Sequence, residues 1–383
     1  MLNLNLSVWS FLIILLFTIL PFLMTVAKAS ELYHDIESLK VVDKSTSDPK
    51  NDDLLLVQRI IKSYQYVSND TEKRGKSMWQ DFYNKRHIPI HQVFKNGQLE
   101  EAAAILRDPA SSELFYGLDN LTIEIQPAIA KNAQSHAIIC LDCLVRLGEA
   151  MGALGYYRPI ETWKAEAVID KLEKTLGQKL SFPNPYPNEY GLWTPRGIVS
   201  YRAPQALYQA WRIKELIKGL GNPRVLEIGA GVGRTAQFAR QLGIKDYTIV
   251  DLPFTLLSSE YFLGTTLGAD QVLLPGEKSD HPEKCIKFMT PDEYFASDEQ
   301  YDLIINVDSL TEMDPSVAQA YWNKIESNGG VFLSINHDAN SFTVQSILEK
   351  SDRIEQYDKK PYWMRKHWQP GKAYFEELVR FKH

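Results

Sequence analysis

The stretch from 224 to 251, RVLEIGAGVGRTAQFARQLGIKDYTIVD, constrains the fold of this chain more than any other part of it. A largely apolar run leads into three glycines at every second position, Gly229, Gly231 and Gly233, and a helix-like segment follows as far as residue 242. A second apolar run then ends on Asp251. This order predicts a strand, a loop, a helix and a second strand, which is the repeating unit of parallel sheets.

The glycine loop is expected to hold a nucleotide-like cofactor. Glycines adopt backbone conformations that are closed to other residues, and they let the main chain approach a ligand at the start of a helix. Asp251 lies where a carboxylate accepts hydrogen bonds from both hydroxyls of a ribose. A P-loop is excluded because no G-K-[ST] follows the glycines. The candidate cofactor-binding residues are Glu227, Gly229, Ala230, Gly231, Gly233, Asp251 and Leu252.

The spacing of the glycines separates two classes of cofactor. A nicotinamide or flavin fingerprint requires G-x-G-x-x-G, whereas this loop is G-x-G-x-G with an acidic residue two places before its first glycine. The loop, followed by VDLP, resembles the S-adenosylmethionine (SAM) methyltransferases of the doubly wound class. The resemblance implies SAM as cofactor and an α/β, doubly wound, Rossmann-like sheet of seven strands. A nicotinamide-dependent oxidoreductase and an empty glycine turn remain as alternatives.

The composition of the chain limits which domains, partners and metal sites we expect. The chain has 383 residues, enough for a doubly wound domain and a smaller one, and its formal net charge of −6 gives no reason to expect nucleic acid. Three cysteines cannot build a disulfide framework, and Cys140 and Cys143 are expected to be buried helical residues. No metal site is predicted, because the spacing of the candidate carboxylates does not demand one.

Residues 1–30 are expected to be a signal peptide or a membrane anchor. The segment 8–27, VWSFLIILLFTILPFLMTVA, carries no charge and is long enough to cross a bilayer. The AKA sequence ahead of residue 30 also suits a signal-peptidase site, and a translation start at Met24 would remove most of the apolar run. We prefer a single-pass anchor with a cytosolic catalytic domain over a cleaved, exported protein, and we expect membrane contact through residues 8–27.

The remaining chain divides by composition. Residues 31–53 are predicted to be a polar tether, 54–180 a helical domain, 181–202 a linker rich in proline and aromatic residues, and 203–383 the cofactor-binding domain. In the linker, Tyr186, Tyr190 and Trp193 are either sugar-stacking residues or exposed aromatics. Arg196 or Arg202 is placed to reach a carboxylate of the cofactor.

Candidate catalytic residues follow two of the predicted strands, and we expect them to face the same cleft. In a doubly wound sheet, ligands bind beyond the carboxyl ends of the strands. The buried strand 301–307, YDLIINV, is followed by Asp308 and Glu312, and the strand VFLSIN is followed by His337. Near the end of the chain, RIEQYD and YFEELVRF are expected to form a hairpin that adds one antiparallel strand to the sheet.

Four motifs carry a narrower resemblance. VDLP, NVDSLTEMD, SINHDAN and PYWMRKHW together resemble a family of sugar O-methyltransferases, which implies a sugar or glycan acceptor. A sugar hydroxyl needs a general base, for which we rank His337 first, then Glu312, then Asp308. A non-sugar acceptor and a catalytically inactive binding protein with the methyltransferase fold remain as alternatives.

Overall fold

The computed structural model describes residues 53–68, 87–109, 114, 133–155, 163–186, 189, 191–362, 364 and 370–382. The expectation of a single-pass membrane anchor is corrected here, because none of the helices in these ranges has the length and apolarity that crossing a bilayer requires. Residues 1–30, on which the expectation rested, lie outside the described ranges. Nearly all of the tether and most of PYWMRKHW lie outside them too.

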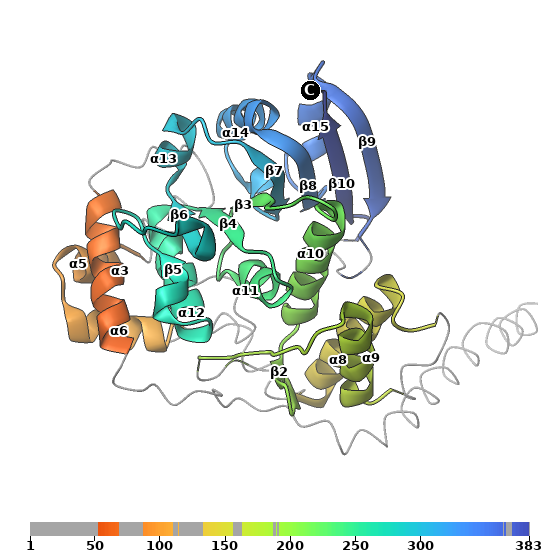
Figure 1. Ribbon diagram of the computed structural model, residues 1–383, viewed down its shortest axis with the longest axis horizontal. Coiled ribbons are helices and arrows are strands. Elements are labelled where there is room, and N and C mark those ends of the chain that lie inside the picture. Colours follow the sequence, from red (N-terminus) through yellow and green to blue (C-terminus); the bar gives the residue numbers. More distant parts are fainter. Residues whose placement is uncertain are drawn as a thin grey trace, which may run out of the picture.

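A sheet of eight strands forms the centre of the molecule (Figure 1). The strands run in the order β5-β6-β4-β3-β7-β8-β10-β9, and β10 is antiparallel to both of its neighbours while the other paired strands are parallel. The predicted doubly wound sheet is confirmed, and the two-residue strand β5 extends it at one edge. The strands are β3 (Arg224–Ile228), β4 (Asp246–Val250), β5 (Val272–Leu273), β6 (Ile286–Met289), β7 (Tyr301–Val307), β8 (Gly329–His337), β9 (Ile354–Pro361) and β10 (Tyr374–Phe381).

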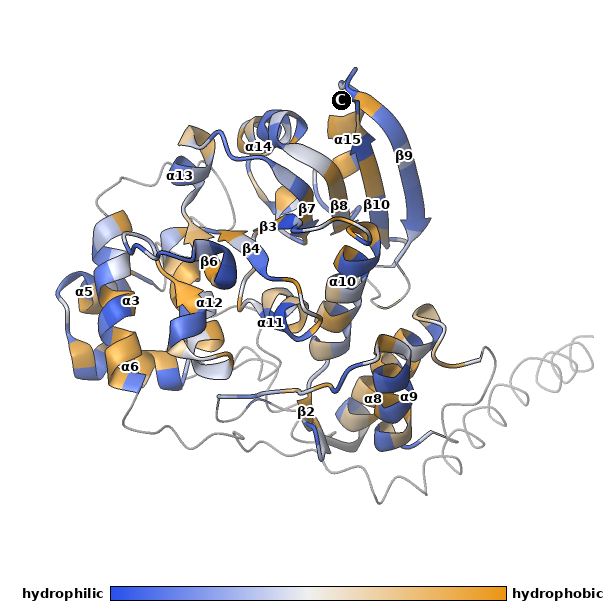
Figure 2. Ribbon diagram, viewed as in Figure 1, coloured by the Kyte–Doolittle hydropathy of each residue, from blue (hydrophilic) through white to orange (hydrophobic). Residues whose placement is uncertain are grey.

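The central strands are mostly apolar because helices cover both faces of the sheet. Successive side chains of a strand point to opposite faces, so Val225 and Leu303 join one core while Leu226 and Ile304 join the other. Figure 2 shows the hydrophobic residues of the central strands between these helices. The first core contains α10 (Ala203–Leu216), α11 (Arg234–Gln241) and α12 (Pro253–Thr266), and the second contains α14 (Pro315–Asn328) and α15 (Val344–Leu348).

The helices that precede residue 180 form two groups in the described structure (Figure 1). One group, α3 (Asp53–Val67), α5 (Ile88–Lys95) and α6 (Leu99–Arg107), packs against α12, and the other, α8 (Ala133–Ala150) and α9 (Ala165–Leu176), packs against α10. Helix α3 is fastened by Arg59, which pairs with Glu277 at 2.7 Å, and by Ser63, whose hydroxyl donates to the buried Glu260 at 2.9 Å. These contacts hold α3 against α12 and against the segment that follows β5.

The proline-rich segment contains a small hairpin of β1 (Leu192–Thr194) and β2 (Gly197–Val199). Tyr186 is fully buried, and its ring stacks with those of Tyr261 and Phe262, so it is a core residue rather than a sugar-stacking one. Trp193 is 49% exposed, and Tyr190 lies outside the described residues.

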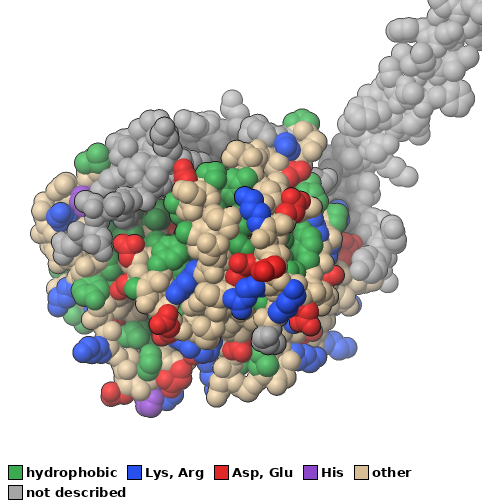
Figure 3. Space-filling model, turned by 90° about the horizontal axis from the view of Figure 1, so that it is seen from above, with side chains coloured by type: hydrophobic (Ala, Val, Ile, Leu, Met, Phe, Trp, Pro, Cys, Tyr) green, Lys and Arg blue, Asp and Glu red, His purple; other side chains and the backbone are tan. Residues whose placement is uncertain are grey.

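The described surface carries charges of both signs. On the face in Figure 3, Lys and Arg side chains are intermixed with Asp and Glu side chains. Lys287 of β6 contacts Asp246 of the neighbouring strand β4 at 2.6 Å. This mixed pattern accords with the small net charge of the chain.

Candidate cofactor and active site

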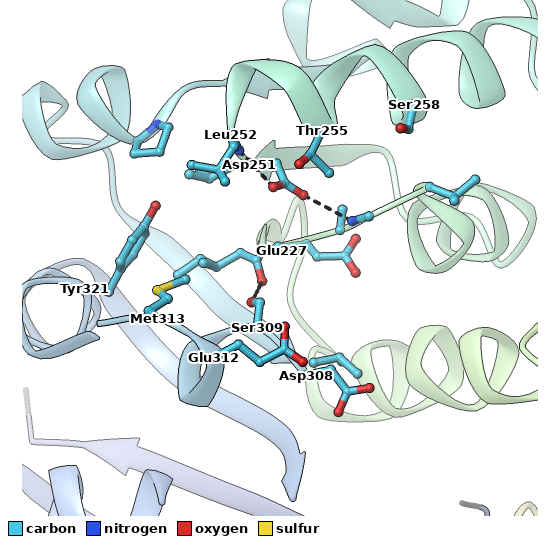
Figure 4. A pocket seen from close by; sticks show the side chains of 18 of the residues that line it. Glu227, Asp251, Leu252, Thr255, Ser258, Asp308, Ser309, Glu312, Met313 and Tyr321 are labelled. Carbon is cyan, nitrogen blue, oxygen red and sulfur yellow. Dashed lines mark hydrogen bonds between the residues drawn. The ribbon is translucent and has the colours of Figure 1, made fainter. Parts of the chain in front are cut away.

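A cavity of about 800 Å³ opens at the carboxyl ends of β3, β4 and β7. It is bounded by the glycine loop after β3, by the start of α12 after β4, and by the turn after β7. Figure 4 shows Asp251, Leu252 and Thr255 on one side of it and Asp308, Ser309 and Glu312 on the other. The cavity therefore lies where the sequence predicted a ligand, at the edge to which parallel strands deliver their following loops.

The glycine loop is shaped by close contact with the turn after β7. Gly229 has φ +76°, and a Cβ added there would lie 2.1 Å from the Oγ atom of Ser309. Gly231 also has a positive φ, but an added Cβ would meet nothing within 4 Å. Of the predicted cofactor-binding residues of this loop, Gly229, Ala230 and Gly231 line the cavity, whereas Gly233 is the N-cap of α11, and a Cβ added to it would face Leu263.

Asp251 fixes the loop to the end of β4. Its Oδ2 atom accepts a hydrogen bond from the Gly231 N–H at 3.1 Å, and its Oδ1 atom accepts one from the Leu252 N–H at 2.8 Å. Both bonds are drawn in Figure 4. Burial raises the pKa of the Asp251 carboxyl to about 6, although these backbone bonds act in the opposite direction. The carboxylate is thus held in one orientation at the wall of the cavity.

Glu227 is a second buried acid at the cavity wall, with 2% of its surface exposed. Burial raises its pKa to about 7, while hydrogen bonds from Tyr247 and Thr235 oppose the shift. The Tyr247 hydroxyl donates to Glu227 Oε2 at 2.9 Å, and Thr235 Oγ1 also lies 2.5 Å from Gln209 Oε1 of α10. A buried carboxyl held in this way is suited to a cationic group of a ligand.

The turn after β7 brings two further carboxylates to the cavity, Asp308 and Glu312. Asp308 has φ +60°, the one positive value at a non-glycine residue among those described. Such a conformation costs free energy, and it persists only where the surroundings enforce it. Its N–H donates to Ile335 O at 3.1 Å, and the short 3-10 helix η7 (Leu310–Glu312) follows.

The first-ranked base is placed differently from these carboxylates. His337 is the last residue of β8, and it is not among the described residues that line the cavity. Its Nδ1 atom accepts a hydrogen bond from the Ala339 N–H at 3.2 Å, and its ring packs edge-on against Tyr374, with centroids 5.3 Å apart. In the described structure, Glu312 and Asp308 therefore both line the cavity, whereas His337 lies beside Tyr374 of β10.

Several lining residues were missed because they come from distant parts of the chain. Val67 and His87 reach the cavity from the first helical group, and the His87 ring stacks on Phe254 with centroids 4.2 Å apart. Of the two arginines considered for a cofactor carboxylate, Arg202 lines the cavity, whereas Arg196 pairs with Glu173 and Asp170 of α9. Arg234, by contrast, lines the cavity from a position that directly follows the glycine loop in the sequence.

The contact between Gly229 and Ser309 leads to a stability prediction. We expect Gly229→Ala to lower the free energy of unfolding by about 3 kcal/mol, because it adds a steric clash to the cost of a positive φ. Gly243→Ala is the matched control, since Gly243 has φ +88° but open space around an added Cβ. It should cost only about 1 kcal/mol in urea titrations. Equal losses for the two variants would contradict the close contact.

No protein-family model and no curated protein matches the chain. Among solved structures, a protein of Thermoplasma acidophilum is similar at 14% identity, over 46% of this chain and 89% of its own, with a TM-score of 0.33. The magnesium protoporphyrin IX methyltransferase of Synechocystis, solved with SAM bound, is similar at 18% identity, over 47% and 80%, with a TM-score of 0.31. A SAM-dependent methyltransferase of Clostridium acetobutylicum is similar at 13% identity, over 46% and 92%, with a TM-score of 0.33. These similarities leave the activity to be argued from the residues of the cavity.

Proposed function

We propose that the chain is a SAM-dependent O-methyltransferase that methylates a hydroxyl of a sugar or glycan. The observation that carries the proposal is Asp251, whose carboxylate is locked to the Gly231 and Leu252 N–H groups at the cavity wall. At the carboxyl end of the second strand of such a unit, a carboxylate can accept hydrogen bonds from the two hydroxyls of a ribose, and the glycine loop beside it leaves room for the ligand.

Two residues that line the cavity are suited to bind the amino acid part of SAM. Glu227 would hold the ammonium group of its amino acid part, and Arg202 lies on the same cavity for its carboxylate. When bound, SAM supplies a methyl group on a positively charged sulfur, which is already activated for transfer. The protein must therefore orient the acceptor hydroxyl and receive its proton.

The acceptor side combines carboxylates with aromatic rings. Glu312 and Asp308 can accept hydrogen bonds from hydroxyls, and one of them would take the proton of the reacting oxygen. Tyr362 and Tyr374 line the same cavity and offer flat apolar surfaces for a sugar ring. This mixture supports a polyhydroxylated acceptor over a purely apolar one.

The proposal is tested by two measurements on the full-length chain. S-adenosylhomocysteine (SAH) should raise the melting temperature and bind in calorimetry, whereas NADH should do neither. Radiolabelled methyl groups should then pass from SAM to members of a panel of sugars and glycosides. A response to NADH in place of SAH would indicate an oxidoreductase, and no response to either ligand would indicate an inactive binding protein.

The raised pKa of Glu227 predicts a pH dependence. The pKa of Glu227 is about 7 in the folded protein and about 4.5 in the unfolded chain. Between pH 4.5 and pH 7, Glu227 is therefore ionised in the unfolded chain but protonated in the folded protein. The free energy of unfolding of the ligand-free protein consequently falls as the pH rises through this range. The ammonium group of SAH favours the ionised form, so we expect the affinity for SAH to increase about tenfold from pH 6 to 7.5. Calorimetry across this range checks the prediction. Glu227→Gln should bind more weakly and lose most of this dependence, the remainder coming from Asp251 with its pKa of about 6, and an unchanged slope in that variant would contradict the assignment.

A further inference from the structure

Two buried asparagines lie beneath the cavity, one near the end of each of two neighbouring strands. Asn306 of β7 is fully buried, and Asn336 of β8 is 2% exposed. Buried amides cost free energy unless each of their polar atoms has a partner. A buried amide pair near the ends of two neighbouring parallel strands therefore calls for an explanation.

Asn306 joins the glycine loop to the turn after β7. Its Nδ2 atom donates to Ile228 O at 2.9 Å and lies 2.5 Å from Ser309 Oγ, while its Oδ1 atom accepts from the Leu310 N–H at 3.2 Å. Ser309 Oγ also donates to Ile228 O at 3.1 Å, a bond that Figure 4 shows. The Asn306 side chain thus contacts the last carbonyl of β3 and two residues of the turn after β7, Ser309 and Leu310.

Asn336 fixes the orientation of that side chain. Its Nδ2 atom donates to Asn306 Oδ1 at 2.9 Å and to Ser334 Oγ at 2.9 Å, so the Asn306 amide must present its own Nδ2 to the loop. The Thr311 hydroxyl lies 3.4 Å from Asn336 Oδ1, and Asn340 donates to Thr311 Oγ1 at 3.1 Å. The network therefore reaches from β3 to the loop after β8.

We propose that Asn306 and Asn336 are positioning residues that hold the glycine loop and the acidic turn as one unit. The network presses Ser309 against Gly229 and keeps Asp308 in its left-handed conformation. It thereby sets the cofactor loop and the two candidate bases relative to each other. This inference rests on the proposed function, and its alternative is a buried network that contributes only to the stability of the fold.

Asparagines near the end of β8 and just before its start provide the test. Asn336→Leu breaks the network near the end of β8, and Asn328→Leu is its matched control at the end of α14, one residue before β8 begins. Asn328 is 4% exposed, donates to Glu299 O at 2.6 Å and is not among the described residues that line the cavity. We expect both variants to lower the melting temperature by similar amounts. The Kd for SAH should rise about tenfold in Asn336→Leu and stay within about twofold in Asn328→Leu.

A milder variant guards against loss of folding. Thr311→Val keeps the shape of the side chain but removes its hydrogen bonds to Asn336 and Asn340, so the Kd for SAH should rise about threefold. If wild type binds SAH and both network variants bind it equally well, the positioning role is wrong while the proposed function stands. If wild type itself does not bind SAH, both proposals fail.

Discussion

Replacing Asp251 by alanine is expected to weaken SAH binding by about a hundredfold or more. The substitution removes the acceptor for the Gly231 and Leu252 N–H groups, which hold the loop in shape, and it removes the carboxylate proposed to bind the ribose. Hydrogen bonds to charged groups contribute about 1.5–3 kcal/mol each, so the loss of the two proposed bonds from the ribose hydroxyls accounts for the expected loss of affinity. Isothermal titration calorimetry with SAH measures the effect.

Asp246→Ala provides the control from the other end of the same strand. Asp246 is the first residue of β4 and pairs with Lys287 on β6. Its loss should lower stability slightly and leave the Kd for SAH within about twofold of wild type. If Asp251→Ala also binds SAH within threefold of wild type, Asp251 does not hold the ribose and the proposed cofactor site is wrong.

The parts of the site that the sequence predicted are local in the chain. The glycine loop, Asp251 and the turn after β7 each follow a continuous apolar strand, and a parallel sheet brings the carboxyl ends of such strands to one edge. Residues close in sequence to a strand end are therefore placed by topology alone. The predicted antiparallel strand near the end of the chain, now β10, followed from the same kind of local pattern.

The parts that the sequence did not predict depend on contacts between distant segments. Gly229 needs to be glycine because of Ser309, and His87 reaches the cavity because its helical group packs on α12. His337 was ranked first as a base because the unperturbed pKa of histidine suits a base near neutral pH, and it was expected at the cleft because it follows the predicted strand VFLSIN. Its placement, however, depends on the pairing of β8 with β10, which sets His337 opposite Tyr374. A register between antiparallel strands cannot be read from one strand.

Of the three candidate bases, Glu312 and Asp308 are the ones among the cavity-lining residues, so we expect one of them, rather than His337, to act as the general base. Glu312→Gln keeps the size and hydrogen-bonding shape of the side chain but cannot accept the proton of a hydroxyl. We expect it to lower kcat by about a hundredfold or more, as the loss of a general base does in other enzymes. Because Glu312 lies across the cavity from Asp251, the Kd for SAH should stay within about threefold of wild type.

Two companion variants decide which group takes the proton. Asp308→Asn should lower kcat less than Glu312→Gln if Glu312 is the base, and more if Asp308 is, since each variant removes only one candidate proton acceptor. His337→Ala should keep kcat within a few-fold of wild type, because His337 is not among the described residues lining the cavity. Labelled methyl transfer to the best sugar of the panel measures all three. A hundredfold loss in His337→Ala, with both carboxylate variants active, would restore the histidine as the base and require the end of β8 to turn toward the acceptor.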